Sequence, residues 1–119
     1  MVRVVNNKVT LVQSELPEMN DDEILVRMHS CGICGSDLEK VYGNYGMKSL
    51  RVGHEPAGHV IKVGKNTKNF QIGDRVFVHH HVSCYTCRYC LQGNYTMCYN
   101  YQNSNIDPCG LSEQFIVPK

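Results

Sequence analysis

The sequence predicts a mainly β domain, built as a small barrel or sandwich. Three observations favour this fold class: the apolar residues fall in several short runs of strand length, glycine-containing turns separate these runs, and only one short segment favours a helix. A chain of 119 residues is long enough for one domain with a single modest core. It contains no internal repeat and no Gly-x-Gly-x-x-Gly motif, so a dinucleotide-binding βαβ unit is not expected.

The N-terminal part of the chain favours strands. Residues 2–12 are predicted to be extended, with a turn near Asn6 and Asn7. Residues 14–22 are predicted to form a loop that contains an acidic cluster. Residues 24–30 alternate apolar and polar side chains, which is typical of a strand with one buried face.

The one predicted helix covers residues 36–41. Ser36 is in a position to act as its N-cap, and Glu39 follows three residues later, which is the spacing of a capping box. We therefore expect a short helix directly after the strand at 24–30.

The remaining segments alternate between predicted strands and irregular structure. Residues 42–50 are predicted to form a loop, and 57–63 and 75–82 are predicted to be strands. Residues 83–107 are rich in Cys, Tyr and Asn and show no period, and 115–117 form a last short strand. An irregular segment of that length needs stabilisation from something other than a core.

Composition disfavours several classes of protein. The 12 basic and 11 acidic residues give a net charge of +1, without the basic excess of a nucleic-acid-binding domain. No apolar run approaches the roughly 20 residues that span a bilayer. Asn6, Asn7 and Lys8 interrupt any signal-peptide apolar region, so we expect a cytoplasmic protein without a membrane partner. In that compartment, seven cysteines favour metal binding or thiol chemistry over disulfides.

Four of the cysteines have the spacing of a structural zinc site. The pattern is C-x2-C-x2-C-x7-C, formed by Cys84, Cys87, Cys90 and Cys98. Zinc binds four thiolates in a tetrahedron at about 2.3 Å, and a closed shell of this kind has no open position for a substrate. Metal binding would also supply folding free energy that the composition of the loop does not provide.

Three other interpretations of these cysteines are weaker. They could be incidental cysteines in a loop, although four within 15 residues is an unusual density. A nucleic-acid-binding zinc module would need phosphate contacts, but Arg88 is the only basic residue between 83 and 118. A thioredoxin-like redox pair lacks its βαβ context and would leave Cys98 unexplained.

A second group of candidate metal ligands lies where two predicted strands approach a loop. CGICGSD (31–37) follows one strand, and Gly53-His54-Glu55-Pro56 precedes the next. Cys34 and His54 are good zinc ligands and Glu55 can be one, and three protein ligands with an open position are the arrangement of a catalytic zinc. From residue type alone, Cys34 could also be a buried cysteine and His54 a structural histidine.

Five motifs in this order resemble the N-terminal catalytic domain of medium-chain zinc-dependent alcohol dehydrogenases. The motifs are CGICGSD (31–37), GHEPAGHV (53–60), GDRV (73–76), the four-cysteine spacing (84–98) and GLSEQFIVP (110–118). CGSD and the Glu after the His are most similar to sorbitol and threonine dehydrogenases. The resemblance implies a GroES-like, partly open β-barrel over residues 1–119, with short helices and a zinc-stapled loop. The Rossmann cofactor domain of the family is expected to be absent from this chain.

The resemblance also implies a role for individual residues. Cys34 and His54 would hold the catalytic zinc, and Glu55 would join or leave its shell. Ser36 would relay the substrate proton, and Asp37 would orient the histidine ligand, although a carboxylate at a helix start is its alternative role. The structural zinc would be held by Cys84, Cys87, Cys90 and Cys98. Cys31 matches no family role, and we expect it to be a small buried residue.

A run of three histidines, 79–81, falls on the predicted strand 75–82. His79 and His81 would then face one side of the strand and His80 the other. The resemblance implies that His80 lines the substrate pocket, which would favour a hydroxyl-rich or amino-alcohol substrate. Three residues on a polar face are the alternative, and a separate metal site is less favoured.

Two positions depart from the pattern of the family. Glu39 replaces a histidine that extends the proton relay in many members, and Gly35 replaces an arginine that contacts the cofactor pyrophosphate in some. We therefore expect this chain to contribute few cofactor contacts.

The resemblance implies oxidation of a small alcohol or polyol, with catalytic and structural zinc and with NAD or NADP bound by a domain outside this chain. The 119 residues alone are then expected to be inactive, and the full-length enzyme to be a homo-oligomer without a nucleic-acid partner. The alternative is a non-catalytic, zinc-stabilised β module that binds a partner protein.

Overall fold

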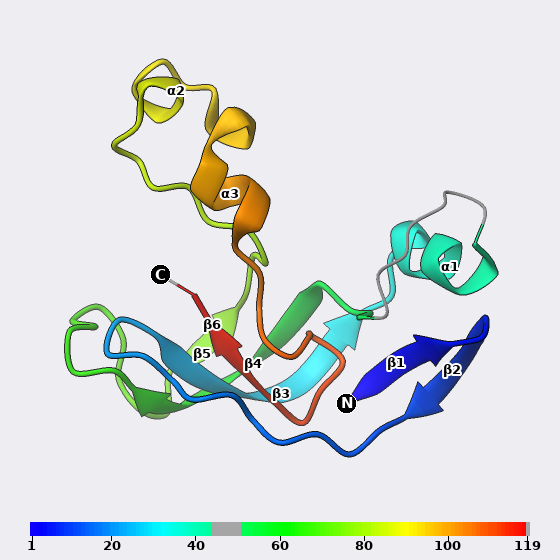
Figure 1. Cartoon of the computed structure of the whole chain (residues 1–119). Coiled ribbons are helices and arrows are strands. Elements are labelled where there is room, and N and C mark those ends of the chain that lie inside the picture. Colours follow the sequence, from blue (N-terminus) through cyan, green and yellow to red (C-terminus); the bar gives the residue numbers. More distant parts are fainter. Residues whose placement is uncertain (44–50, 119) are drawn as a thin grey trace.

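Two antiparallel sheets form the framework of the structure (Figure 1). The computed structural model describes residues 1–43 and 51–118. One sheet pairs β1 (Val2–Val5) with β2 (Lys8–Leu11). The other has the order β5-β4-β3-β6, formed by β3 (Ile24–Gly32), β4 (Glu55–Val63), β5 (Arg75–Phe77) and β6 (Gln114–Val117). Within residues 1–43 and 51–118, strands predominate and neither sheet closes on itself, so the predicted mainly β, partly open fold is confirmed.

The predicted turn near Asn6 and Asn7 joins β1 to β2. Both asparagines have positive φ angles, 50° and 57°, and Val5 pairs with Lys8 directly across the turn. Two successive residues with positive φ match the right-handed twist of a hairpin, and Asn tolerates this conformation better than most residues.

Strand β3 is central because it pairs with β4 on one side and β6 on the other. Its predicted alternation is confirmed at the start of the strand, where Ile24 and Val26 are buried and Leu25 and Arg27 are not. The largest core cluster lies against this sheet and consists of Ile24, Val26, Val60, Val78, Ile106 and Phe115. Among the described residues, no helix has the length and apolar character to cross a bilayer.

The strand predicted at 75–82 is shorter than expected, because β5 ends at Phe77. The Val78 N–H still donates to the Pro56 carbonyl at 2.9 Å. Pro56 has no N–H to donate to the Val78 carbonyl, so the hydrogen-bond ladder between β4 and β5 cannot continue. The three histidines therefore lie beyond the strand, and the predicted alternation of their faces is wrong: Nδ1 of His79 donates to the His81 carbonyl at 2.7 Å.

Helix α1 (Gly35–Tyr42) is the predicted helix, but its cap is different. The N-cap is Cys34 and not Ser36, and the Asp37 carboxylate accepts the Cys34 N–H at 3.2 Å. A carboxylate three residues after the cap is the stronger partner for that N–H, so Glu39 has no capping role. Of the loop predicted at 42–50, Tyr42 ends the helix, Gly43 is its C-cap, and 44–50 lie outside the described residues.

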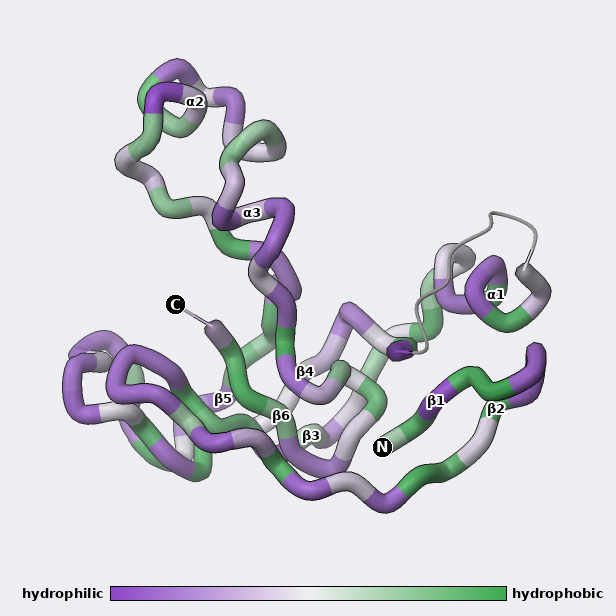
Figure 2. The backbone as a smooth tube through the Cα atoms, in the orientation of Figure 1, coloured by the Kyte–Doolittle hydropathy of each residue, from purple (hydrophilic) through white to green (hydrophobic). Residues whose placement is uncertain are grey.

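Residues 84–103, here called the cysteine lobe, project away from the sheets (Figure 1). The lobe contains α2 (Arg88–Leu91), a 3-10 turn (Tyr95–Met97) and α3 (Tyr99–Asn103). Within these three helical segments only Cys90 is buried, and Cys98 is buried between two of them. Figure 2 shows that α3 is hydrophilic whereas β6 is hydrophobic. The lobe therefore has no apolar core of its own, as its composition predicted.

Phe115 gives a test of the core. Its side chain is 0% exposed, so Phe115→Ala is expected to lower the free energy of unfolding by about 3 to 5 kcal/mol. The control is Phe77→Ala on the edge strand β5, because Phe77 is 89% exposed and its loss should change stability by about 0.5 kcal/mol or less. Urea denaturation of the zinc-saturated chain measures both values. Equal losses for the two variants would contradict this account of the core.

Candidate metal centres

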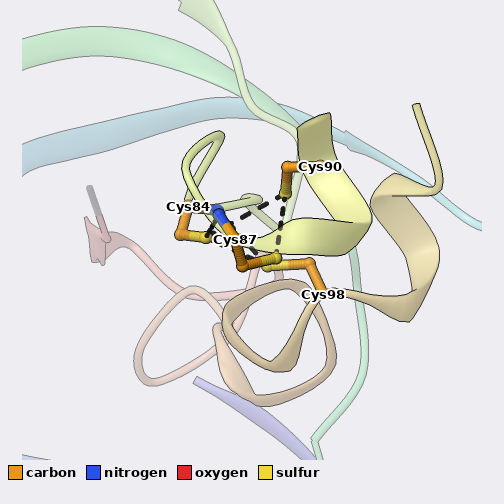
Figure 3. Close-up of side chains that lie close together, drawn as sticks. All are labelled: Cys84, Cys87, Cys90 and Cys98. Atoms are coloured by element: carbon orange, nitrogen blue, oxygen red, sulfur yellow. Dashed lines mark hydrogen bonds between the residues drawn. The ribbon is translucent and has the colours of Figure 1, made fainter. Parts of the chain in front are cut away.

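The four sulfur atoms of the cysteine lobe converge on one point (Figure 3). All lie within 4.8 Å of one another, and the Sγ–Sγ distances are 3.6 Å for Cys87–Cys90, 3.6 Å for Cys84–Cys98 and 4.0 Å for Cys84–Cys90. A tetrahedral zinc ion with sulfur at about 2.3 Å requires edges of about 3.8 Å. The spacing and the softness of these donors therefore fit zinc.

Backbone N–H groups favour the thiolate form of two of these cysteines. Tyr85 adopts a left-handed φ of 58°, and the N–H groups that follow it bond to Cys84. The N–H and hydroxyl of Thr86, followed by the N–H of Cys87, lower the pKa of Cys84 to about 6. The Cys84 N–H donates to Sγ of Cys98 at 3.4 Å and is the main cause that lowers the pKa of Cys98.

Cys90 has the opposite environment. Burial raises the pKa of its thiol to about 12. A metal ion that binds here must therefore displace a proton from Cys90, whereas Cys84 is ready as a thiolate near neutral pH. Metal binding by the lobe is therefore expected to weaken as the pH falls, because protons compete with the metal for the sulfurs.

A second set of ligand atoms meets where β3, β4 and α1 come together. Cys34, His54 and Glu55, here called the Cys34 group, each offer one ligand atom within 4.8 Å of the others. Register explains the meeting, because Gly32 at the end of β3 pairs with Glu55 at the start of β4. A Cβ atom on Gly32 would collide with the Glu55 side chain, so a larger residue there would force the Glu55 carboxylate to shift.

Asp37 connects the parts of the Cys34 group. It is 3% exposed, and its carboxylate accepts the N–H of Cys34 at 3.2 Å and the N–H of Gly53 at 3.0 Å. Burial alone would raise the pKa of Asp37, but these two N–H groups and the nearby cations outweigh it, so the pKa is lowered. Gly53 has a φ of 83°, a conformation that favours glycine, at the same residue whose N–H donates to Asp37.

The imidazole ring of His54 lies between two carboxylates. Nδ1 of His54 lies 3.5 Å from Oδ1 of Asp37, and Nε2 lies 3.8 Å from Oε1 of Glu55. A carboxylate behind one ring nitrogen orients the other toward a metal. One thiolate, one imidazole and one carboxylate suit a divalent ion such as zinc and leave one tetrahedral position open.

His80 lies next to this group. Its ring centroid is 4.9 Å from that of His54, and both residues line a cavity of about 320 Å³ with Glu55 and His79. Burial, followed by repulsion from neighbouring histidines, lowers the pKa of His80 to about 4. The ring is therefore neutral near neutral pH and can donate or accept a hydrogen bond in the cavity.

The sequence analysis did not single out Lys40 as a neighbour of the Cys34 group, and it expected Cys31 to be a small buried residue. Lys40 lies 3.6 Å from Asp37, at the i,i+3 spacing of a helical pair, which could have signalled the contact. Cys31 is half-buried and belongs to neither metal group, and burial raises the pKa of its thiol. Ser36 lies on the first turn of α1, two residues after Cys34.

Comparison with known proteins gives consistent matches. A family model described as the alcohol dehydrogenase GroES-like domain matches residues 20–119. The chain is 40% identical over 98 residues to a sorbitol dehydrogenase from Bombyx mori. This match covers 77% of this chain and 28% of that protein. Galactitol-1-phosphate dehydrogenase from Escherichia coli is structurally similar, with a TM-score of 0.82 and 29% identity over 99% of this chain and 35% of that one.

A cobalt- and zinc-bound thermostable alcohol dehydrogenase from Pyrobaculum aerophilum is also similar. Its TM-score is 0.76 at 28% identity, over 98% of this chain and 39% of that one. The chain spans about a third of the length of the relatives that it matches.

Loss of one lobe cysteine should unfold the lobe. Cys87→Ser leaves three thiolates in the lobe. We expect it to lower the free energy of unfolding by more than about 4 kcal/mol, as the loss of a structural metal does. Proteases should then cut within residues 84–103 before they cut the sheets. Limited proteolysis with mass spectrometry measures the order, and Cys31→Ala is the control. A Cys87→Ser variant that resists cleavage like the parent would contradict a structural metal.

Asp37→Asn should change how stability depends on pH. Because the pKa of Asp37 is lowered on folding, its ionised form stabilises the fold above the ordinary value of 3.8, and this contribution is lost as the pH falls through the folded value. The variant should lose about 1 to 3 kcal/mol at neutral pH, because a buried acceptor is impaired.

Urea denaturation at neutral pH and below about pH 3 should show that acidification lowers the free energy of unfolding less in Asp37→Asn than in the parent. Asp21→Asn is the control, because Asp21 lies in an exposed ion pair with Lys65. If acidification lowered the free energy of unfolding of Asp37→Asn as much as that of the parent, the Asp37 carboxylate would not contribute to the pH dependence of stability.

Proposed function

The chain belongs to the alcohol dehydrogenase GroES-like domain family, and on that premise we propose that it is the zinc-binding catalytic domain of an alcohol or polyol dehydrogenase. One observation supports this most directly. The Cys34 group offers three ligands with an open position beside a cavity, while the cysteine lobe offers four ligands in a closed shell. A closed shell serves structure and an open one can accept a substrate.

The Cys34 group is the proposed catalytic site. Zinc bound there would act as a Lewis acid on a substrate hydroxyl or carbonyl oxygen. Asp37 would fix the ring of His54, and Glu55, whose Oε1 lies 3.8 Å from Nε2, would join or leave the ligand set. Ser36 would move the substrate proton toward solvent. The neutral ring of His80 would bind a further hydroxyl of the substrate, which favours a polyol over an aliphatic alcohol.

The cofactor is proposed to bind elsewhere in a longer protein. Residues 1–119 contain no Gly-x-Gly-x-x-Gly motif, so NAD or NADP would bind a Rossmann domain that these residues do not form. We expect the 119-residue chain alone to be inactive, and the whole enzyme to be a cytoplasmic homo-oligomer.

Zinc stoichiometry tests this proposal. We expect about two zinc ions per parent chain after reconstitution and desalting, and about one for either Cys34→Ala or Cys87→Ser, because each variant breaks one ligand set. Cys31→Ala is the matched control and should keep both ions. A parent chain that binds only the ion of the lobe would instead indicate a non-catalytic zinc-stabilised module. In the whole protein, Cys34→Ala should abolish NAD(P)-dependent oxidation of polyols, and retained activity would reject the assignment.

A further inference from the structure

Lys40 is a nearly buried lysine close to the Cys34 group. Its side chain is 12% exposed, whereas Lys65 in a surface ion pair is 75% exposed. Burial of an ammonium group is costly unless a partner compensates the charge. The partner is Asp37, whose Oδ1 atom lies 3.6 Å from the Lys40 ammonium.

The same oxygen atom also faces the histidine. Oδ1 of Asp37 lies 3.5 Å from Nδ1 of His54 and accepts the N–H of Gly53 at 3.0 Å. Lys40 and His54 therefore compete for one carboxylate oxygen. The stronger the interaction of Asp37 with Nδ1, the more basic the ring becomes as a metal ligand at Nε2.

We infer that Lys40 is a positioning residue that weakens the action of Asp37 on His54, so that the imidazole donates less electron density to a metal in the Cys34 group. This inference rests on the proposed function, because it requires a divalent ion at Cys34, His54 and Glu55. The ammonium group of Lys40 compensates the negative charge of the buried Asp37 carboxylate. Because Lys40 interacts with the same Oδ1 atom, the contact of that atom with Nδ1 of His54 is weaker. The result is an ion that is held less tightly and stays more electron-deficient, which suits a Lewis acid.

Cobalt(II) titration of the 119-residue chain tests this effect. The cysteine lobe is first filled with one equivalent of zinc, and cobalt(II) is then added under competition with a chelator. The visible absorption of the second metal gives its dissociation constant. Lys40→Met keeps the aliphatic stem and removes the charge, so it should tighten cobalt binding by about threefold to tenfold. Lys40→Gln is the second variant and should shift affinity in the same direction.

A double-mutant cycle separates the action through Asp37 from a general charge effect. Removal of any nearby cation would favour metal binding, but that effect would persist when Asp37 is neutral. We expect the gain from Lys40→Met to fall below about twofold in the Asp37→Asn background. Lys65→Met is the matched control and should not change the dissociation constant.

Each outcome is decisive. Tighter binding that disappears in the Asp37→Asn background supports the inference. Unchanged or weaker binding in both Lys40 variants, with a second equivalent still bound by the parent, overturns it and leaves the proposed function intact. The same gain in both backgrounds also overturns it. A parent chain without a second equivalent overturns both the inference and the proposed function.

Discussion

The buried carboxylate of Asp37 is the interaction on which the Cys34 group depends. It accepts an N–H from the cap of α1 and another from the turn before β4, so two segments distant in sequence share one anion. Each of the two segments supplies a ligand of the group, Cys34 from the first and His54 from the second. A carboxylate in this position is stable only while its lone pairs are occupied. The carboxylate that joins the segments therefore also lies 3.5 Å from Nδ1 of His54.

The two metal groups are held in place by different means. The Cys34 group is assembled by the register of β3 and β4, by α1 and by Asp37, all of which are formed from the protein alone. The cysteine lobe has short helices, little buried surface and two backbone-stabilised sulfurs, Cys84 and Cys98. Under the proposed function, a bound ion would supply much of its folding free energy. Such a lobe can be built from polar residues because its ligands replace a core.

Alternation and spacing in the sequence were sufficient to predict the mainly β fold and the cluster of four lobe cysteines, whereas the Cys34 group was predicted mainly from the order of motifs that resembles alcohol dehydrogenases. The alternation of residues 24–30 and the intervals between the lobe cysteines depend on local geometry, which a sequence displays directly. The end of β5 was not predictable, because it depends on Pro56 in a partner strand that only the fold brings opposite. The cap at Cys34 and the contact of Lys40 with Asp37 likewise depend on a turn whose start the sequence left open.

Hydrogen bonds at the base of the cysteine lobe, where residues 81–82 meet residues 100–104, connect the lobe to the Cys34 group. The side chain of Asn100 donates to the Val82 carbonyl at 3.0 Å, and the Val82 N–H donates to Oγ of Ser104 at 2.8 Å. Nδ1 of His81 donates to the Ser104 carbonyl at 2.8 Å. These bonds fix the chain next to His80, whose ring lies against His54. Under the proposed function, an ion that orders α3 would therefore also restrain one wall of the cavity beside the Cys34 group, so a metal without an open position would still contribute to the geometry of the open one.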